Sequence, residues 1–322
     1  MKPALMALLA SVLLPAAALA EAPTADIAPR TELHAIPTMT MSDSDFLAGK
    51  NGKAATVAGQ LRIAQGTGKL PVVVLMHGSG GMGAQLDTWS RLFNAMGVST
   101  FAIDGFTGRG LASVNTNQAE LGRLNFILDI YGALAILAKH PRVDPQRIVL
   151  MGFSRGGQAA LYASLTRFHK MWNKSGASFA AYIPFYPDCA TSYIDDTDVA
   201  ATPIRIFHGI ADDYNPVSSC KAFLARLKSA GRDIELTEYA DAHHGFDSPI
   251  GAVVVAKGAQ TVRACTIKEG PVGVLVNTAT SAPFTYTDAC VQLDPHVGRN
   301  AAAAAASQAA VGDFVRTLFK LK

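Results

Sequence analysis

The feature that most constrains the fold of this chain is a short run of apolar, β-branched residues that ends in a cluster of glycines. Leu70–Met76 (LPVVVLM) is apolar at almost every position, and the segment HGSGG follows it directly. A strand with one face in water alternates apolar and polar side chains, whereas a strand that is apolar on both faces is buried on both. The run therefore predicts a central strand of a parallel sheet that is covered by helices.

Similar apolar runs recur along the chain and are separated by segments with helical periodicity. Strands are predicted at 54–64, 70–76, 98–103, 147–151, 179–185, 204–207 and 234–239, and helices at 86–96, 125–139, 158–168, 218–230 and 301–319. This alternation predicts an α/β fold with a mostly parallel, doubly wound sheet and helices on both faces. We find no internal repeat and no linker, so residues 21–322 are expected to form one domain.

Two stretches interrupt the alternation. Residues 21–49 are polar with scattered prolines and are expected to form an N-terminal arm. Residues 250–297 separate the last strand from the last helix, and their Pro, Gly and Thr content favours a short hairpin insertion. The insertion could cover an active site or brace the last helix, and the sequence leaves both roles open.

Residues 1–20 have the features of a secretory signal peptide. Lys2 precedes an apolar stretch, and Ala18-Leu19-Ala20 forms a small-x-small cleavage site. The apolar stretch is shorter than the roughly 20 residues that span a bilayer, and no later run is long enough. We therefore expect cleavage after Ala20 and a periplasmic or secreted protein without a membrane span.

Four cysteines follow this segment: Cys189, Cys220, Cys265 and Cys290. An even number of cysteines behind a signal peptide favours disulfides, and a zinc site is disfavoured because no C-x-x-C spacing is present. Cys265 and Cys290 bracket the insertion, whereas Cys189 and Cys220 each follow a predicted core strand. Of the three pairings that four cysteines allow, these positions favour Cys189–Cys220 and Cys265–Cys290.

The charge balance and composition exclude several classes of protein. The chain has 28 Lys and Arg against 25 Asp and Glu, a formal net charge of +3, which is too small to indicate binding to nucleic acid. With 49% hydrophobic residues among 322, the chain can bury a large core, which excludes disorder along its whole length.

A candidate nucleophile lies in the segment GFSRG, residues 152–156, which matches G-x-S-x-G. A predicted strand ends directly before Ser154 and a predicted helix begins after it, as a nucleophile elbow requires. Glycines are needed there because the backbone turns sharply around a strained serine. The alternative is a tight strand–helix turn whose serine takes no part in chemistry.

A serine hydroxyl needs a base to take its proton, and the base needs an acid that orients it. In this kind of fold the acid and then the histidine follow the serine, each at the carboxyl end of a later strand. The segments FHGIADD and YADAHHGF meet this requirement with Asp212 or Asp213 and with His243 or His244. Neighbouring side chains diverge, so one member of each pair can face Ser154, and the residues alone do not choose between them.

Two backbone N–H groups are candidates for an oxyanion hole. The residue after the nucleophile, Arg155, supplies one in this geometry, and the loop after the strand at 70–76 can supply the second from Ser79. A phosphate-binding loop is the alternative for this glycine-rich segment, but it lacks the Walker lysine. His77 and His208 each precede a glycine at a strand end and are expected to be structural.

A metal site formed by Asp241, His243, His244 and Asp247 is the alternative for the histidine segment. It has no helical i, i+4 pair and no other recognised ligand spacing, so neither a metal nor a cofactor is predicted.

Together these segments resemble the dienelactone hydrolase family of the α/β-hydrolases. The resemblance covers about residues 54–250 and the closing helix, through PVVVLMHGSGG, GFSRGG, IFHGIADDYNPVSSC and YADAHHGFD. It implies an α/β-hydrolase fold, Asp212 as the acid and His244 as the base. Dienelactone hydrolases proper carry a cysteine nucleophile, so Ser154 suggests a broader ester hydrolase. The HG-x-A-D-D segment is also similar to prolyl oligopeptidase-type peptidases, whose large accessory propeller this chain cannot contain.

The expected activity is hydrolysis of a small-molecule carboxylic ester or lactone through an acyl-enzyme, without a cofactor. Arg109, on a loop after a predicted strand, could contact an acidic substrate group, or it could brace its loop. The alternatives are a small-peptide or acyl-amide hydrolase with the same triad, and a non-catalytic binding protein on the same fold. The sequence indicates no oligomeric state.

Overall fold

The computed structural model describes residues 27–321, so the predicted signal peptide lies outside it. Its centre is an eight-stranded sheet in the order β1-β2-β4-β3-β5-β6-β8-β9. The strands are β1 Arg30–Thr40, β2 Lys53–Ile63, β3 Leu70–Met76, β4 Ser99–Asp104, β5 Val143–Phe153, β6 Ala181–Phe185, β8 Ile204–Gly209 and β9 Ile234–Tyr239. Neighbours from β4 to β9 pair in parallel, whereas β1 and β2 are antiparallel to their neighbours. The predicted mostly parallel α/β fold is confirmed.

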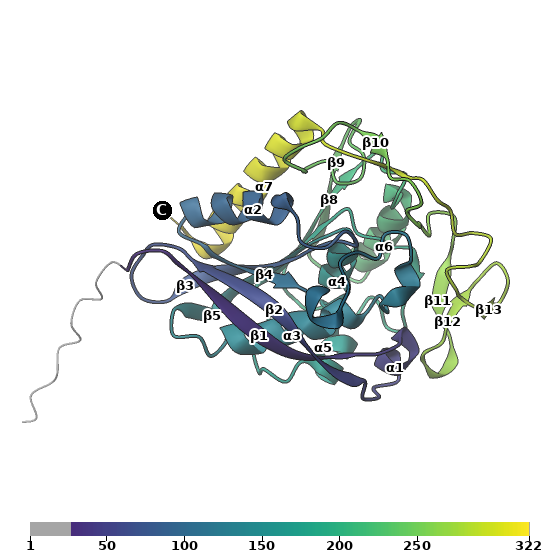
Figure 1. Ribbon diagram of the computed structural model, residues 1–322, viewed down its shortest axis with the longest axis horizontal. Helices are drawn as coiled ribbons and strands as arrows, with labels where there is room; N and C mark the ends of the chain where they lie inside the picture. Colours follow the sequence, from purple (N-terminus) through teal and green to yellow (C-terminus); the bar gives the residue numbers. More distant parts are fainter. Residues whose placement is uncertain (1–26, 322) are drawn as a thin grey trace, which may run out of the picture.

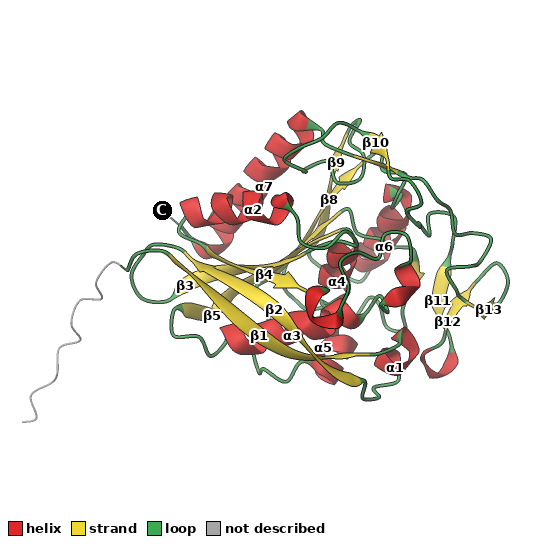
Figure 2. Cartoon of the chain, in the orientation of Figure 1, coloured by secondary structure: helices red, strands yellow, loops and turns green. Residues whose placement is uncertain are grey.

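Helices pack on both faces of the sheet (Figure 1; Figure 2). They are α1 Asp43–Leu47, α2 Ala84–Ala95, α3 Asn125–Leu137, α4 Arg155–Tyr162, α5 Thr166–Trp172, α6 Val217–Ser229 and α7 Ala301–Phe319. Strand β3 shows why its sequence is apolar throughout. Val72, Val74 and Met76 join one buried cluster with residues of α3, α4 and α6, whereas Val73 and Leu75 join another with residues of α2 and α7.

Two expectations about the elements are wrong. Residues 30–40 of the expected N-terminal arm form the edge strand β1, which pairs with β2 along its whole length. Its signal is weak because Ile36 is its one buried residue and Pro37 interrupts it, as is common in edge strands. The single helix expected at 158–168 is divided into two helices, because α4 ends at Tyr162 and α5 begins at Thr166. Between them, Leu165 forms an isolated β-bridge with Val199.

The insertion is more extensive than the expected hairpin. Strands β11 Ile267–Glu269, β12 Leu275–Asn277 and β13 Ala282–Pro283 form a small sheet with β7 Thr191–Ser192, while β10 Val254–Val255 pairs with β14 His296–Val297. In Figure 1 the strands β11 to β13 lie together at one side of the molecule, beyond the edge of the central sheet.

Two disulfides fasten these segments, and they are the pairs that the sequence favours. Cys265–Cys290 closes the insertion, and Cys189–Cys220 joins the loop after β6 to helix α6. Between residues 27 and 321, no helix combines the length and the apolar character needed to cross a membrane.

Candidate active site

Ser154 occupies a sharp turn between β5 and α4. Its φ of 56° and ψ of −117° are unusual for a residue with a side chain. The turn depends on close backbone contacts, because a Cβ on Gly152 would lie 2.0 Å from the carbonyl oxygen of Gly156. A Cβ on Gly156 would lie 2.2 Å from the carbonyl oxygen of Met76. The glycines of the motif are therefore required by packing, and the strained serine fits a functional position.

A continuous hydrogen-bonded chain links Ser154, His244 and Asp212. Nε2 of His244 lies 2.8 Å from Oγ of Ser154, and Nδ1 of His244 lies 2.8 Å from Oδ2 of Asp212. Asp212 follows β8, and His244 lies in the loop after β9. Because a carboxylate only accepts hydrogen bonds, the proton of His244 lies on Nδ1, which leaves Nε2 free to accept the hydroxyl proton of Ser154. This is the geometry that a serine nucleophile, a histidine base and an orienting acid require.

The neighbours of these residues face elsewhere. The carboxylate of Asp213 lies 2.9 Å from Nδ1 of His296 and 3.3 Å from the guanidinium of Arg263. The ring of His243 packs against that of His296 with centroids 5.6 Å apart. Of each adjacent pair, Asp212 and His244 lie in the hydrogen-bonded chain with Ser154, whereas Asp213 and His243 lie outside it.

Aromatic rings hold His244 in place. The ring of Tyr214 stacks on it with centroids 4.6 Å apart, and Tyr186 contacts it edge-on at 4.7 Å. Both tyrosines follow the carboxyl ends of core strands. Neither tyrosine is predicted from the sequence, because the only signal for each is its position after a predicted strand.

His77 and His208 are buried behind the site. Burial lowers the pKa of His77 to about 4, and its Nε2 accepts a hydrogen bond from the Gly105 N–H group at 3.0 Å. Burial also lowers the pKa of His208, whose Nδ1 lies 3.1 Å from the carbonyl oxygen of Gly209. Both rings are thus neutral at physiological pH and support the strand ends, in agreement with the expected structural role.

The two backbone groups expected for the oxyanion hole belong to residues near Ser154. Arg155 is the first residue of α4, where N–H groups have no partner within the helix. The loop of Ser79 lies against Ser154, since a Cβ on Gly78 would lie 3.1 Å from Cβ of Ser154. Ser79 and Arg155 line the same cavity as Ser154.

The cavity at Ser154 has two lobes. The wide lobe has a volume of about 250 Å³ and is lined by His244, Tyr186 and Met82 among others. The narrow lobe, about 30 Å³, is bordered by Ser154 and Arg155 and is lined mainly by polar residues: Gln118, Arg123, Gln158, Asp188, Asn215, Gln260 and Thr261.

The insertion contributes to both lobes. Ala256 and Val297 line the wide lobe, and Gln260, Thr261 and Tyr286 line the narrow one. The end of the insertion also contacts the histidine loop, because Val297 forms a bridge with His244 and the Gly298 N–H group donates to the carbonyl oxygen of His244. The insertion therefore lines the cavity at Ser154, as the first of its two possible roles requires. It also contacts the loop that carries His244.

Arg109 does not contact the site, which corrects the expectation that it could bind substrate. Its side chain is 3% exposed and forms two hydrogen bonds with Asp129, at 2.7 and 2.8 Å. It also donates to the carbonyl oxygens of Gly105 and Met39 and to the hydroxyl of Thr40. Arg109 braces its loop against β1 and α3, as in the second reading of the sequence.

Asp247 is a buried carboxyl that the sequence analysis considered only as a metal ligand. It accepts hydrogen bonds from Nε1 of Trp89 at 2.7 Å, from the hydroxyl of Tyr186 at 2.7 Å and from Gln85 at 2.5 Å. Burial raises the pKa of Asp247. Because three protein donors surround it, Asp247 connects the histidine loop to α2 and β6 and has no geometry for a metal.

Comparison with known proteins identifies the family of the chain and several similar hydrolases. The model of the dienelactone hydrolase family matches residues 57–267. Among curated proteins, NocK of Nocardia uniformis subsp. tsuyamanensis, which is named as an esterase, is 26% identical over 169 residues, or 51% of this chain and 46% of that protein. Acyl-protein thioesterase 1 of Gibberella zeae is 33% identical over 104 residues, or 32% of this chain and 43% of that protein. The chain thus spans less than half the length of these relatives.

One solved structure resembles this protein in fold over most of the chain. A dienelactone hydrolase-like promiscuous phosphotriesterase from metagenomic libraries matches with a TM-score of 0.57 at 17% identity. The match covers 89% of this chain and 98% of that one. At this identity the likeness concerns the fold alone.

Proposed function

Because the chain belongs to the dienelactone hydrolase family, we propose that it is a serine hydrolase that cleaves carboxylic esters or lactones through an acyl-enzyme. The observation that carries the proposal is the hydrogen-bonded chain from Ser154 through His244 to Asp212, with both links at 2.8 Å and a cavity beside the serine.

In the proposed reaction, Oγ of Ser154 attacks the carbonyl carbon while Nε2 of His244 takes the hydroxyl proton. Asp212 stabilises the imidazolium that forms and keeps its ring in position. The proton then passes from His244 to the leaving alkoxide, and the acyl group remains on Ser154. Water activated by the same histidine releases the acid and restores the serine.

The backbone N–H groups of Ser79 and Arg155 are proposed to bind the oxyanion of the tetrahedral intermediate. Arg155 N–H lies at the N-terminus of α4, where the helix dipole favours negative charge. A pair of such donors contributes several kcal/mol to transition-state stabilisation, since loss of one costs about 3–4 kcal/mol in a well-studied protease.

The shapes of the two lobes suggest which part of the substrate each accepts. The leaving-group oxygen must lie beside His244, which lines the wide lobe, so the alcohol part is placed there. The acyl part then enters the narrow, polar lobe. Gln158 lines that lobe, and its amide Nε2 has no hydrogen-bond partner among residues 27–321. This favours short acyl groups that carry a hydrogen-bond acceptor near the carbonyl.

We further propose that the protein acts in the periplasm or outside the cell after removal of residues 1–20. Two disulfides, Cys189–Cys220 and Cys265–Cys290, support an oxidising compartment, since such bonds are rare in the cytosol.

The test is hydrolysis of p-nitrophenyl esters by residues 21–322, with disulfides intact, beside Ser154→Ala. Turnover that disappears in the variant supports the proposal, and faster turnover of acetyl and methoxyacetyl than of hexanoyl esters supports the assignment of the narrow lobe. Hydrolysis of p-nitroanilides with the same acyl groups tests the alternative, an acyl-amide hydrolase. A folded protein that neither turns over esters nor reacts with a fluorophosphonate probe at Ser154 would contradict the proposal.

A further inference from the structure

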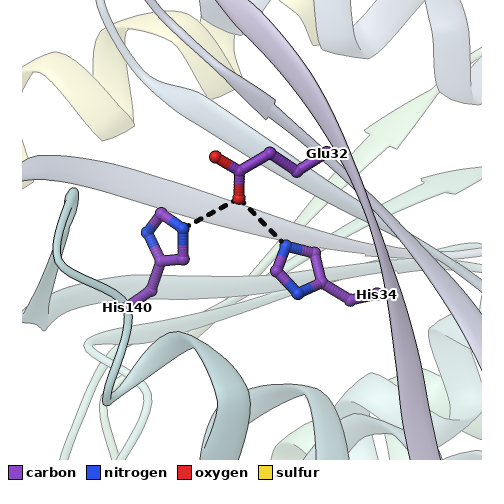
Figure 3. A group of neighbouring side chains, drawn as sticks. All are labelled: Glu32, His34 and His140. Atoms are coloured by element: carbon purple, nitrogen blue, oxygen red, sulfur yellow. Dashed lines mark hydrogen bonds and ion pairs between the residues drawn. The ribbon is translucent and has the colours of Figure 1, made fainter.

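Three side chains with metal-binding atoms, Glu32, His34 and His140, point toward one another (Figure 3). Glu32 and His34 are two residues apart on β1, so their side chains point to the same face of the strand. His140 lies in the loop between α3 and β5 and precedes the start of β5, whereas Ser154 follows the end of β5. The group is therefore separate from the proposed active site.

The spacing of the three ligand atoms is close to that of a zinc site. Oε2 of Glu32 lies 2.9 Å from Nε2 of His140 and 3.2 Å from Nε2 of His34, and all three atoms lie within 4.8 Å of one another. In a tetrahedral zinc site with bonds of 2.0–2.1 Å, neighbouring ligand atoms are about 3.3 Å apart. A set of two imidazoles and one carboxylate suits zinc and is unsuited to magnesium or calcium, which prefer oxygen ligands.

The surroundings orient the carboxylate and leave room for a fourth ligand. Nε of Arg30 donates to the other oxygen of Glu32 at 2.7 Å, which directs Oε2 toward the two histidines. The side chains of His34 and Glu32 are 22% and 25% exposed, so an ion and a water molecule can reach them from solvent.

Without a metal, the same groups form hydrogen bonds with one another. The Arg142 N–H group donates to Nδ1 of His140 at 3.2 Å, so the proton of a neutral His140 lies on Nε2 and is donated to Glu32. Zinc binding through Nε2 requires the other tautomer of His140, with its proton on Nδ1, and therefore gives up the contact with Arg142. The free energy of binding must exceed this loss.

We propose that Glu32, His34 and His140 bind one zinc ion, with water as the fourth ligand, and that the ion fastens the edge strand β1 to the α3–β5 loop. Strand β1 pairs with one neighbour only, β2, so a link to the α3–β5 loop would add an attachment on a second side. A metal that binds only the folded strand stabilises the protein in proportion to its saturation. The ion has a structural role here, because it lies at the end of the sheet away from Ser154.

The experiment uses untagged protein, residues 21–322, freed of metal with a chelator and titrated with Zn²⁺ and Co²⁺. We expect one ion per chain by elemental analysis, a visible absorption spectrum of tetrahedral cobalt, and a rise of a few degrees in Tm with saturating zinc. The double variant Glu32→Gln/His34→Gln should lose the bound ion, the cobalt spectrum and the Tm increase.

His169→Gln, which removes a histidine of α5 outside the group, is the matched control and should retain all three properties. Equal metal uptake by the double variant and the control would place the ion elsewhere and overturn the proposal, as would the absence of stoichiometric binding by the folded parent. If the double variant does not fold, Glu32→Gln alone, which preserves side-chain shape, must still lower zinc affinity by at least 10-fold, as loss of a metal-linked side chain does. Ester hydrolysis should be unchanged in every variant.

Discussion

Asp212 is held at both of its carboxylate oxygens, and only one of them faces His244. Oδ2 lies 2.8 Å from Nδ1 of His244, while Oδ1 accepts hydrogen bonds from the backbone N–H groups of Tyr214 and Asn215 at 2.9 and 2.8 Å. The backbone thus fixes the carboxylate, and the carboxylate fixes the tautomer and orientation of the imidazole.

Asp212→Asn tests this relationship. The amide can present its NH2 group to Nδ1, which stabilises the wrong tautomer and leaves no base at Nε2. We expect kcat for a p-nitrophenyl ester to fall by about 10⁴-fold, as in a protease triad, with little change in stability. Asp213→Asn is the matched control, because Asp213 faces His296 and Arg263, and its kcat should remain within a few-fold of the parent. A larger loss in Asp213→Asn than in Asp212→Asn would reverse the assignment.

Arg109→Ala separates a bracing role from substrate recognition. The change leaves the buried carboxylate of Asp129 without its cation, which typically costs about 3–5 kcal/mol of unfolding free energy. Chemical denaturation measures this loss. Any reduction in kcat/KM should be equal for anionic and neutral esters, and the double variant Arg109→Met/Asp129→Leu should recover part of the stability. A selective loss on anionic esters would restore the substrate-contact interpretation.

The lowered pKa of His77 predicts that the free energy of unfolding falls between neutral and mildly acidic pH. Burial lowers its pKa to about 4, below the ordinary value of 6.5, so the unfolded chain binds a proton that the folded chain does not in this range. A depressed histidine pKa makes the folded state less stable as pH falls from 6.5 toward 4, by about 3 kcal/mol in total. Urea midpoints across this range should fall more for the parent than for His77→Gln, which cannot gain the charge.

The three hydrogen bonds that Asp247 accepts predict that a substitution at this position destabilises the protein. Its two oxygens accept from Trp89, Tyr186 and Gln85, whereas an asparagine would offer one oxygen and would turn an NH2 group toward a donor. Asp247→Asn should lower the free energy of unfolding by about 1–3 kcal/mol through unpaired buried groups. The exposed Asp313→Asn serves for comparison and should change it by less than about 0.5 kcal/mol. Equal stabilities for the two variants would contradict this view of the network.

Much of the fold and the residues of the candidate triad could be predicted because local sequence patterns indicate them. A strand buried on both faces, such as β3, must be apolar throughout, and the turn around Ser154 excludes side chains at Gly152 and Gly156. Candidate acids and bases are limited to the ends of strands that can be recognised individually. The choice of His244 over His243 came from family resemblance, since two adjacent residues have the same local signal.

The remainder depends on pairing between distant segments, which no local pattern encodes. In β1 the alternation is reversed, since Leu33 is exposed while Glu32 and His34 share the face of the buried Ile36. Only its pairing with β2 therefore marks it as a strand. The pairing of β7 with β11 joins residues far apart in sequence. The same holds for the zinc site proposed here, because His140 is more than 100 residues from Glu32 and no ligand spacing reveals it.

The disulfide Cys265–Cys290 is expected to affect both the stability of the protein and the proposed binding of substrate, because it lies in the insertion. It closes a loop with a sequence separation of 25 residues, whose removal should cost about 3 kcal/mol in the chain-entropy model. Gln260, Thr261 and Tyr286, which belong to the insertion, line the narrow lobe, whereas Ser154, His244 and Asp212 lie outside it. Cys265→Ser/Cys290→Ser should therefore raise KM for short-chain esters more than it lowers kcat, because the lobe loosens while the triad stays in place. Steady-state kinetics below the lowered Tm measure this, and a loss confined to kcat would show that the insertion acts on His244 instead.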